Sequence, residues 1–298
     1  MDVDELLKRY QQGERDFSGK NFKNINLKGL VLPRINLSNT DLSNADLSAT
    51  DLTEANLTGA NLERANFSDA KLTQGNLSQV KAIWTNFTKA DLFRVNFEQA
   101  QLTNTNLQDA NLSEANFSHA KLIQVNFTRA NLSQVILTGC IDLSTINLNQ
   151  ANLTKVDLSG RDLRKANLSG AILTETNLSQ AILSEANLTI ANLTKANLRG
   201  ANLRGSNLQQ ANLTQAILTE ANLAGANLIQ ANLQETKLIR ANLGGANINK
   251  TSFQNADLSW ARLRGINTTL AALKQAKAIL TGAELPNGTI YQEDTEVK

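Results

Sequence analysis

The sequence predicts an all-β solenoid, and three observations carry this prediction. Leu or Phe occupies 24 of the 25 positions that recur every fifth residue from Phe17 to Leu137, the exception being Ala82. After one extra residue the spacing resumes at Leu143 and runs for another 25 positions to Leu263, all of them Leu, Ile or Phe. Asn or Asp precedes this large residue at 19 of the 25 positions in each block, and a small residue, usually Ala, precedes the Asn or Asp.

A five-residue period fits neither a continuous helix nor a continuous strand. In an extended segment the small residue and the large residue (the centre) point to one side, and the residue between them (the face residue) points away. The two residues after the centre must then turn the chain. Pro33 and Pro286 directly follow a Leu, and 12 of the 16 glycines come one residue later, as in a type II turn. Units with Glu, Gln or Lys at this place are expected to form type I turns.

The repeated unit is similar to that of a known family. Residues 65–69 (Ala-Asn-Phe-Ser-Asp) and 201–205 (Ala-Asn-Leu-Arg-Gly) resemble the pentapeptide repeat proteins, and the resemblance covers residues 15–268. It implies a right-handed quadrilateral β-helix with four repeats in each coil and a narrow interior filled by centres and small residues. The opening, a short helix followed by residues 13–17 (Gly-Glu-Arg-Asp-Phe), is similar to a cyanobacterial version of the family.

Five parts are expected along the chain: an N-terminal capping helix (1–13), a first repeat block (14–137), a register slip (138–142), a second repeat block (143–268), and a C-terminal cap with a frayed tail (269–298). Asp2 and Glu5 resemble a capping box. Residues 269–277 have the composition of a short helix, and the five-residue spacing returns weakly at Leu280 and Leu285 before a turn at 286–288.

Two departures from the repeat lie in the middle of the chain. The one-residue insertion beside Cys140 is interpreted as a local bulge, with a bend or a junction between two duplicated blocks as the alternatives. Cys140 itself is expected to be a small buried residue. Arg161 falls at a position that normally holds Ala, where burial of an unpaired charge would be costly.

A few large apolar residues fall on outward positions, and they define a candidate protein-interaction surface. If each coil holds four repeats, Trp260 lies one layer from Ile239 and Arg240. A cluster of Trp and Arg has the composition of an interface hot spot, although incidental exposure is the competing interpretation. Near Ala82, Ile83 or Trp84 could instead tuck inward. The candidate residues are Ile239, Arg240, Trp260, Arg262, Arg264, Trp84 and Phe93.

The composition argues against catalysis, cofactors and metals. One Cys and one His cannot supply a structural zinc site, and a single Cys cannot form an internal disulfide. His119 falls on an outward position without a nearby acid or nucleophile. A filled prism without long insertions offers no cleft for a small-molecule substrate, so no enzyme is expected.

The net charge of +2, from 29 basic and 27 acidic residues, bears on nucleic acids in two ways. A basic stripe is limited to Arg204, Arg262 and Arg264, which argues against direct nucleic-acid binding. Some pentapeptide repeat proteins are DNA mimics that protect DNA gyrase from quinolones. Because mimicry requires a strongly negative surface, the resemblance leaves a gyrase-binding DNA mimic as a disfavoured alternative.

The sequence shows no targeting or membrane-spanning signal. Residues 1–5 are acidic and lack an apolar segment, and no run of 18 apolar residues occurs. A cytoplasmic protein is therefore expected. Its expected role is that of a non-catalytic scaffold that binds another protein, and the sequence does not separate this role from that of a purely structural spacer.

Overall fold

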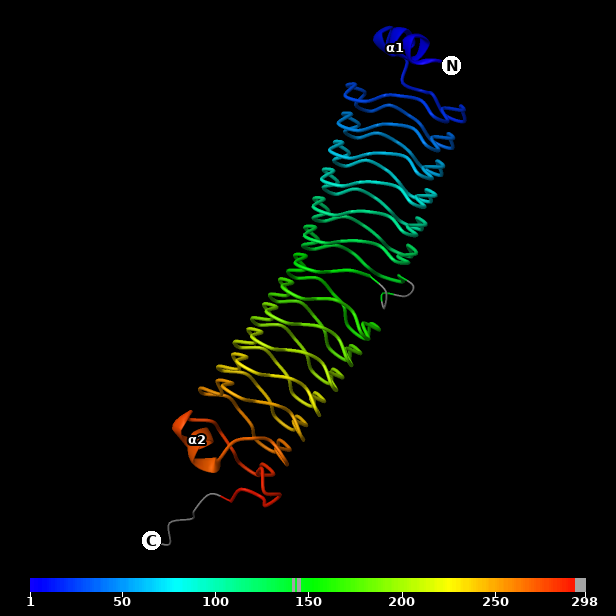
Figure 1. The fold of residues 1–298 in the computed structure, drawn as a ribbon. Helices are drawn as coiled ribbons and strands as arrows, with labels where there is room; N and C mark the ends of the chain where they lie inside the picture. The colour runs from blue at the N-terminus through cyan, green and yellow to red at the C-terminus, as the bar shows by residue number, and fades with distance from the viewer. Residues whose placement is uncertain (141–142, 144–145, 293–298) are drawn as a thin grey trace. The chain divides into compact units, whose positions relative to one another are not determined.

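The computed structural model describes residues 1–140, 143 and 146–292, and it divides into two compact units, Met1–Leu153 and Thr154–Lys298. Both units are built of stacked coils of the chain (Figure 1). The helices are α1 (Val3–Gln11) in the first unit and α2 (Leu270–Gln275) in the second. The rest of the described chain forms isolated β-bridges and turns rather than long strands.

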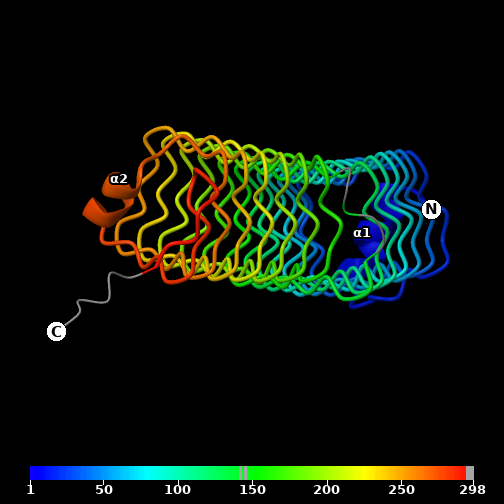
Figure 2. The same cartoon turned by 90° about the horizontal axis from the view of Figure 1, so that it is seen from below.

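Each regular coil contains four repeats in both units. Asp16 pairs in parallel with Asn36 and Asn36 with Asn56, so successive layers are four repeats apart, and Asp157 and Asn177 pair in the same way. Four repeats give four turns, so each coil has four corners (Figure 2). The predicted β-helix is therefore present in each unit.

The interior holds the centres and the small residues, which are almost completely buried. In the first unit, phenylalanine centres stack along the interior, and the rings of Phe67 and Phe87 lie 5.0 Å apart. Ala82 is buried one repeat before Phe87, while Trp84 stays 57% exposed. Trp84 therefore does not tuck into the interior to replace the missing large centre.

The prediction of type I turns is wrong. Every described second turn residue of the two repeat blocks has a positive φ, including Glu54 (58°), Gln79 (58°) and Lys89 (58°). In a type II turn, the second of the two turn residues has a positive φ and the first does not. Here Glu, Gln, Lys and other residues adopt this type II conformation, not only Gly. The physical reason is the stacking of the coils, because the N–H of Glu54 donates to the Thr73 carbonyl of the next coil (2.9 Å). One backbone path is thus imposed on every layer, and it overrides the preference of the single residue.

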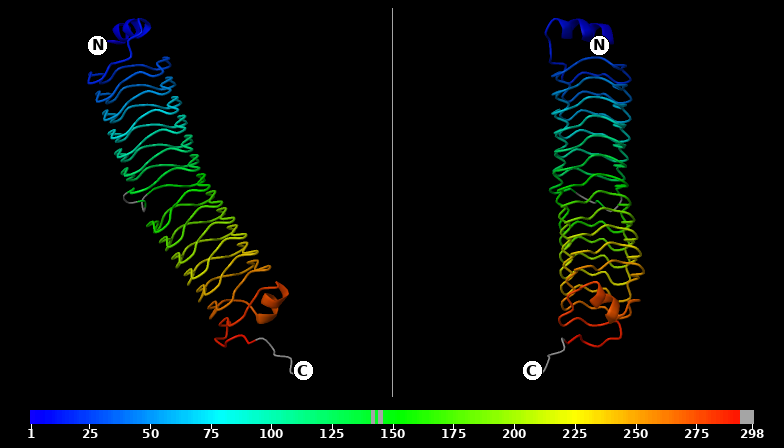
Figure 3. Two further views of the ribbon diagram at one scale, coloured as in Figure 1. Left: turned by 180° about the vertical axis from the view of Figure 1, so that it is seen from behind. Right: turned by 90° about the vertical axis from the view of Figure 1, so that its left-hand side faces the viewer.

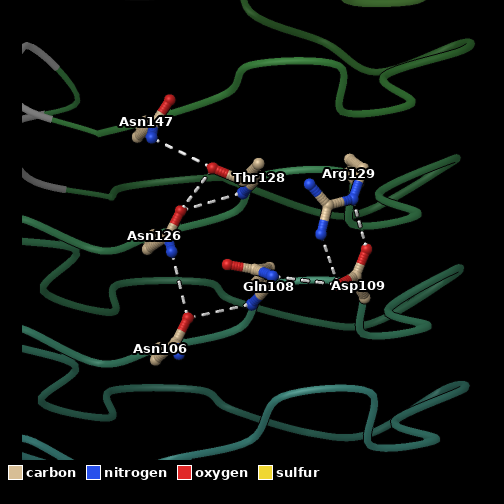
Figure 4. A network of polar contacts seen from close by, with 7 residues as sticks. All are labelled: Asn106, Gln108, Asp109, Asn126, Thr128, Arg129 and Asn147. Carbon is tan, nitrogen blue, oxygen red and sulfur yellow. Dashed lines mark hydrogen bonds and ion pairs between the residues drawn. The ribbon is translucent and has the colours of Figure 1, made fainter.

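The face residues form ladders of side-chain hydrogen bonds. The Oδ1 atom of Asn126 accepts the N–H of Thr128 (3.1 Å), and its Nδ2 donates to Oδ1 of Asn106 in the preceding coil (3.1 Å). Asn147 of the following coil donates to the Thr128 hydroxyl (3.0 Å), as Figure 4 shows. These contacts explain the preference for Asn and Asp, since both accept from the turn and Asn also donates to its neighbour.

The N-terminal end of the first unit is covered by α1 (Figure 3). Asp2 accepts the N–H of Glu5 (2.9 Å), as expected for the N-cap, but the Glu5 carboxylate pairs with Arg9 instead of closing the capping box. Leu6 is fully buried, and the Tyr10 hydroxyl donates to the Pro33 carbonyl (2.8 Å). The helix is thereby fixed over the first coil.

The C-terminal end of the second unit combines α2 with a short hairpin (Figure 3). Thr269 caps α2, which is shorter than the predicted 269–277 segment.

The layer that contains α2 is irregular, because Asp257 pairs with Ile279, two positions beyond the regular four-repeat spacing. Leu280 and Leu285 are buried, as the returning spacing predicts. Glu284 then pairs antiparallel with Ile290, so the chain folds back over its last edge. Of the expected frayed segment 292–298, residues 293–298 lie outside the described residues.

The predicted slip (138–142) is only partly within the described residues, since 141 and 142 lie outside them. Before it, Asn116 pairs with Ile136 at the regular four-repeat spacing, and across it Asn126 pairs with Asn147, one position beyond that spacing. The first unit therefore accommodates the extra residue within one layer. Cys140 is buried, and its Sγ lies 3.0 Å from the Phe117 carbonyl. In the second unit, Arg161 is half-exposed rather than enclosed.

Candidate protein-interaction surface

The two candidate residues of the first unit do not lie together. Trp84 and Phe93 belong to repeats two apart, so they occupy opposite corners of the four-cornered coil. Phe93 is half-buried, and the Arg94 guanidinium lies 4.8 Å from its ring centroid. Only Trp84 leaves most of its surface uncovered, and these two side chains remain separate candidates.

The five candidates of the second unit come together as the four-repeat spacing predicts. The N–H of Arg240 donates to the Ser259 carbonyl (2.9 Å), which places Ile239 and Arg240 one layer from Trp260 at the same corner. Arg262 is the next face residue after Trp260, and Arg264 lies at the following corner. Trp260 is 59% exposed, Ile239 is half-buried, and all three arginines are exposed.

Trp260 and Arg264 also lie against the C-terminal cap, which the sequence did not indicate. A Cβ added at Gly282 would lie 2.5 Å from Cε3 of Trp260, so the indole ring packs directly on this glycine. In the same way, Nε of Arg264 would lie 3.9 Å from a Cβ at Gly288. The surface therefore includes the cap, and the exposed Ile279 (51%) lies in the layer after Asp257.

Further arginines share this side of the second unit. Between residues 197 and 265 there are five arginines, and all are exposed at two neighbouring corners or on the face between them. We call this surface the arginine side, and its arginines are Arg199, Arg204, Arg240, Arg262 and Arg264. Sequence reasoning placed Arg204, Arg262 and Arg264 on one face but missed Arg199, whose position follows from the same count of four repeats per layer.

The arginine side is poorly neutralised. Its one acidic residue between 197 and 265, Glu220, lies 3.7 Å from Arg199 and 4.0 Å from Arg240. Among the described residues, no carboxylate lies within 4.0 Å of Arg204, Arg262 or Arg264. In the described part of the chain these three guanidinium groups therefore form no ion pair.

The first unit shows the contrasting arrangement, in which arginines are paired along a corner. Nε and Nη2 of Arg129 donate to the two carboxylate oxygens of Asp109, at 2.6 and 2.7 Å (Figure 4). The hydrogen bonds from Arg129, with a further one from Gln108, hold the pKa of Asp109 below its ordinary value. Charge is thus cancelled locally at this corner, unlike on the arginine side.

The charged groups that line one hollow of the first unit are engaged within the protein. One hollow of about 400 Å³ is lined by Tyr10, Arg15, Pro33, Arg34, Thr53 and Glu54. Its Glu54 is paired with Arg34 (2.9 Å), and the Arg15 guanidinium lies 3.8 Å from the Tyr10 ring centroid, so its charged groups are already engaged within the protein. The exposed His119 lies over Gly139 at another corner. Throughout the described chain, no group of three or more His, Cys, Asp or Glu side chains could hold a metal ion.

Within the described residues, neither helix is long and apolar enough to span a membrane. This agrees with the short, amphipathic character of α1 and the brevity of α2.

The chain is similar to a protein family and to several solved structures. The family model described as "Pentapeptide repeats (8 copies)" matches overlapping segments that together run from residue 21 to residue 265. No curated protein sequence matches the chain. Several solved structures do, and three are described next.

HetL from the cyanobacterium Nostoc sp. strain PCC 7120, a pentapeptide repeat protein involved in heterocyst differentiation regulation, is 27% identical over 98% of this chain and 100% of its own, with a TM-score of 0.29. A pentapeptide repeat protein from the Arabidopsis thaliana thylakoid lumen is 29% identical over 44% of this chain and 85% of its own, with a TM-score of 0.29. QnrB1, a plasmid-mediated fluoroquinolone resistance protein, is 16% identical over 90% of this chain and 99% of its own, with a TM-score of 0.27.

The match of the family model covers most of the chain, and the described coils have the four-repeat layers that the resemblance implies. The expected right-handed quadrilateral β-helix is the fold of this family. The chain therefore belongs to the pentapeptide repeat family.

Proposed function

We propose that this protein is a non-catalytic binding module that presents a surface of its second unit to another protein. The surface consists of Ile239, Arg240, Trp260, Arg262 and Arg264. The observation that carries the proposal is the indole of Trp260, which is packed on Gly282 and yet 59% exposed, near Arg262 and Arg264, for which the described residues provide no carboxylate within 4.0 Å.

A side chain that is already fixed in the free protein lowers the entropic cost of binding. A large aromatic ring that is already held in place loses little conformational entropy when a partner covers it. Neighbouring arginines add directional hydrogen bonds to acidic or carbonyl groups. Trp and Arg are accordingly the residue types most enriched in interface hot spots.

Affinity capture from a native lysate tests this proposal. The wild-type chain is compared with the double variant Trp260→Ala/Arg264→Ala and with a control, Trp84→Ala/Phe93→Ala, which removes the other two candidate side chains. The proposal predicts a stoichiometric partner that the first variant loses and the control retains. Retention of the partner by both variants, or loss only in the control, would place binding elsewhere and overturn the assignment.

A DNA gyrase supercoiling assay addresses the alternative of DNA mimicry. Mimicry requires a negative surface, whereas the described arginine side is positive and the whole chain carries +2. The expected result is unchanged supercoiling at protein concentrations comparable with that of gyrase. Inhibition or protection of gyrase under these conditions would reverse the ranking of the two functions.

A further inference from the structure

The arginine side differs from the rest of the second unit in both charge and relief. Between residues 197 and 265 it carries five arginines against Glu220, while the remaining surface of the same layers carries Lys237 and Lys250 against Glu235 and Asp257. Within these layers, positive charge is therefore concentrated on one side and the other sides are neutral, while Glu284 of the cap follows Arg262 on the same face in the next layer.

The glycines of these layers follow the same distribution. All six glycines between residues 197 and 265 are turn residues at the two corners of the arginine side: Gly200, Gly205, Gly225, Gly244, Gly245 and Gly265. A Cβ added at Gly225 or Gly245 would meet no atom within 4 Å, so the space above these residues is open. The face between the corners carries the Asn ladder, in which Nδ2 of Asn242 donates to Oδ1 of Asn222 (3.3 Å). The glycines and the short Asn side chains therefore form a polar surface, and the longer guanidinium groups and the Trp260 ring extend beyond it.

We infer that the arginine side binds an extended acidic protein segment that also carries apolar side chains. The inference rests on the proposed function and names the chemistry of its partner. Charge complementarity carries it: three arginines have no carboxylate partner among the described residues, and Glu220 is shared by two others.

The spacing of the arginines suits an extended chain. Arg204 and Arg264 lie at the same corner three layers apart, which at about 4.8 Å per layer is roughly 14 Å. An extended segment covers this length with about four to five residues, at roughly 3.3 Å each. Carboxylates four to five residues apart on such a segment reach Arg204 and Arg264, and the open corner at Gly225 and Gly245 between them allows its backbone to lie close to the coils.

The apolar part of the surface favours a protein over a nucleic acid. Trp260 is more than half exposed, Ile239 lies one layer before it at the same corner, and the exposed Ile279 lies on the adjoining face in the layer after Asp257. A phosphate backbone would contact the arginines but would leave the isoleucines uncovered. An acidic segment with Leu, Ile or Phe side chains covers both groups at once, which adds the burial of apolar surface to the ion pairs.

Fluorescence anisotropy with three labelled probes tests the inference on the full chain. The first probe is a peptide of about 12 residues in which the Glu residues are separated by short segments that contain Leu, and the second is the same peptide with Ser in place of Leu. The third probe is a single-stranded oligothymidine of about 12 nucleotides. The protein variants are Arg204→Glu/Arg264→Glu, Trp260→Ala, and the control Lys237→Glu/Lys250→Glu. The control changes the net charge by the same amount within the same layers, but on other sides of the unit.

The inference predicts that the Leu-containing peptide binds most tightly and that added salt weakens its binding. Arg204→Glu/Arg264→Glu should weaken it about tenfold or more, and the control by less than about twofold. Trp260→Ala should weaken the Leu-containing peptide more than the Ser-containing one. Circular dichroism of each variant verifies that the coils remain folded.

Three results would overturn the inference. The first is an equal loss of binding in the two charge-reversal variants, which would mean attraction by net charge alone. The second is tighter binding of the oligothymidine than of either peptide, which would assign the surface to nucleic acid. The third is a captured lysate partner that depends on Trp260 but is insensitive to Arg204→Glu/Arg264→Glu; there the proposed function would stand and the acidic-segment inference would fail.

Discussion

Trp260 lies directly on Gly282, with Cε3 of the indole 2.5 Å from the place that a Cβ of residue 282 would occupy. The glycine makes room for the ring, and the N–H of Trp260 donates to the Thr281 carbonyl (2.9 Å) in the same layer of the cap. One face of the ring thus fixes the C-terminal cap to the last regular coil, while the ring remains 59% exposed to a partner.

A methyl group at Gly282 should displace this ring. Gly282 and Gly225 share a φ of 67°, but nothing lies within 4 Å of a Cβ at Gly225. We expect Gly225→Ala to lower the free energy of unfolding by about 1 kcal/mol, the cost of a left-handed conformation in an L-residue. Gly282→Ala should cost more and should shift the Trp260 emission to longer wavelength, measured in a Trp84→Phe background. Equal costs with unchanged emission would show that the ring does not depend on this glycine.

Because the second residue of every described turn of the repeat blocks has a left-handed conformation, glycine at this position is expected to stabilise the protein. Gln79 has a φ of 58°, whereas Ser78, the first residue of the same turn, is not in the left-handed region. Gln79→Gly should raise the free energy of unfolding by about 0.5 kcal/mol, because relief of the left-handed strain exceeds the added entropy of the unfolded chain. Ser78→Gly should lower it. Urea denaturation measures both, and a loss of stability in both variants would contradict the turn assignment.

The ladders of face residues should distinguish Asn from Asp by position. Nδ2 of Asn36 donates to Oδ1 of Asp16 (2.9 Å), and Oδ1 of Asn36 accepts from Asn56 (3.1 Å). Asn36→Asp removes the donor and sets two carboxylates together, so we expect a loss of about 1–3 kcal/mol in the free energy of unfolding. Asp16→Asn, at the start of the ladder, keeps the acceptor and should be nearly neutral. Equal effects of the two substitutions in urea denaturation would refute the ladder.

Acid should destabilise the second unit partly through Asp157. The backbone N–H of Ser159 donates to this carboxylate (2.9 Å), and so does Nδ2 of Asn177 (3.0 Å). These hydrogen bonds, that of the Ser159 N–H most of all, lower the pKa of Asp157 in the folded protein. A lowered pKa contributes stability above the ordinary Asp value near pH 4, and that stability is lost as the pH falls through the folded value. Asp157→Asn should therefore flatten the acid limb of a plot of unfolding free energy against pH. An unchanged limb would mean that Asp157 does not contribute.

The coils were predictable because the centre and the small residue must both point inward in every repeat. Leu37 and Leu57 illustrate this, since they lie four five-residue repeats apart and therefore fall in the same interior column. The turn type at Glu54 was not predictable from its own residue, because hydrogen bonds between layers impose the left-handed conformation on it. Local preference and stacking oppose each other at these corners, and stacking prevails.

The candidate surface was predictable only as far as the regular spacing extends. Counting four repeats per layer places Arg240 next to Trp260, and the structure agrees. The contact of Trp260 with Gly282 follows the irregular layer that contains α2, so the regular count fails there. The open corner at Gly225 and Gly245 also becomes visible only once the side chains around it are in place.

Site-specific photo-crosslinking in a native lysate tests the central claim most directly. Ala224 and Gln234 are first turn residues of the same coil, two repeats apart, and Ala224 lies between Arg204 and Arg264 on the arginine side. With a photoreactive residue at position 224 we predict one specific crosslinked protein, and with the same residue at position 234 none. Crosslinking of the same protein from position 234, or from neither position when a partner is captured, would contradict the assignment of the arginine side as the binding surface.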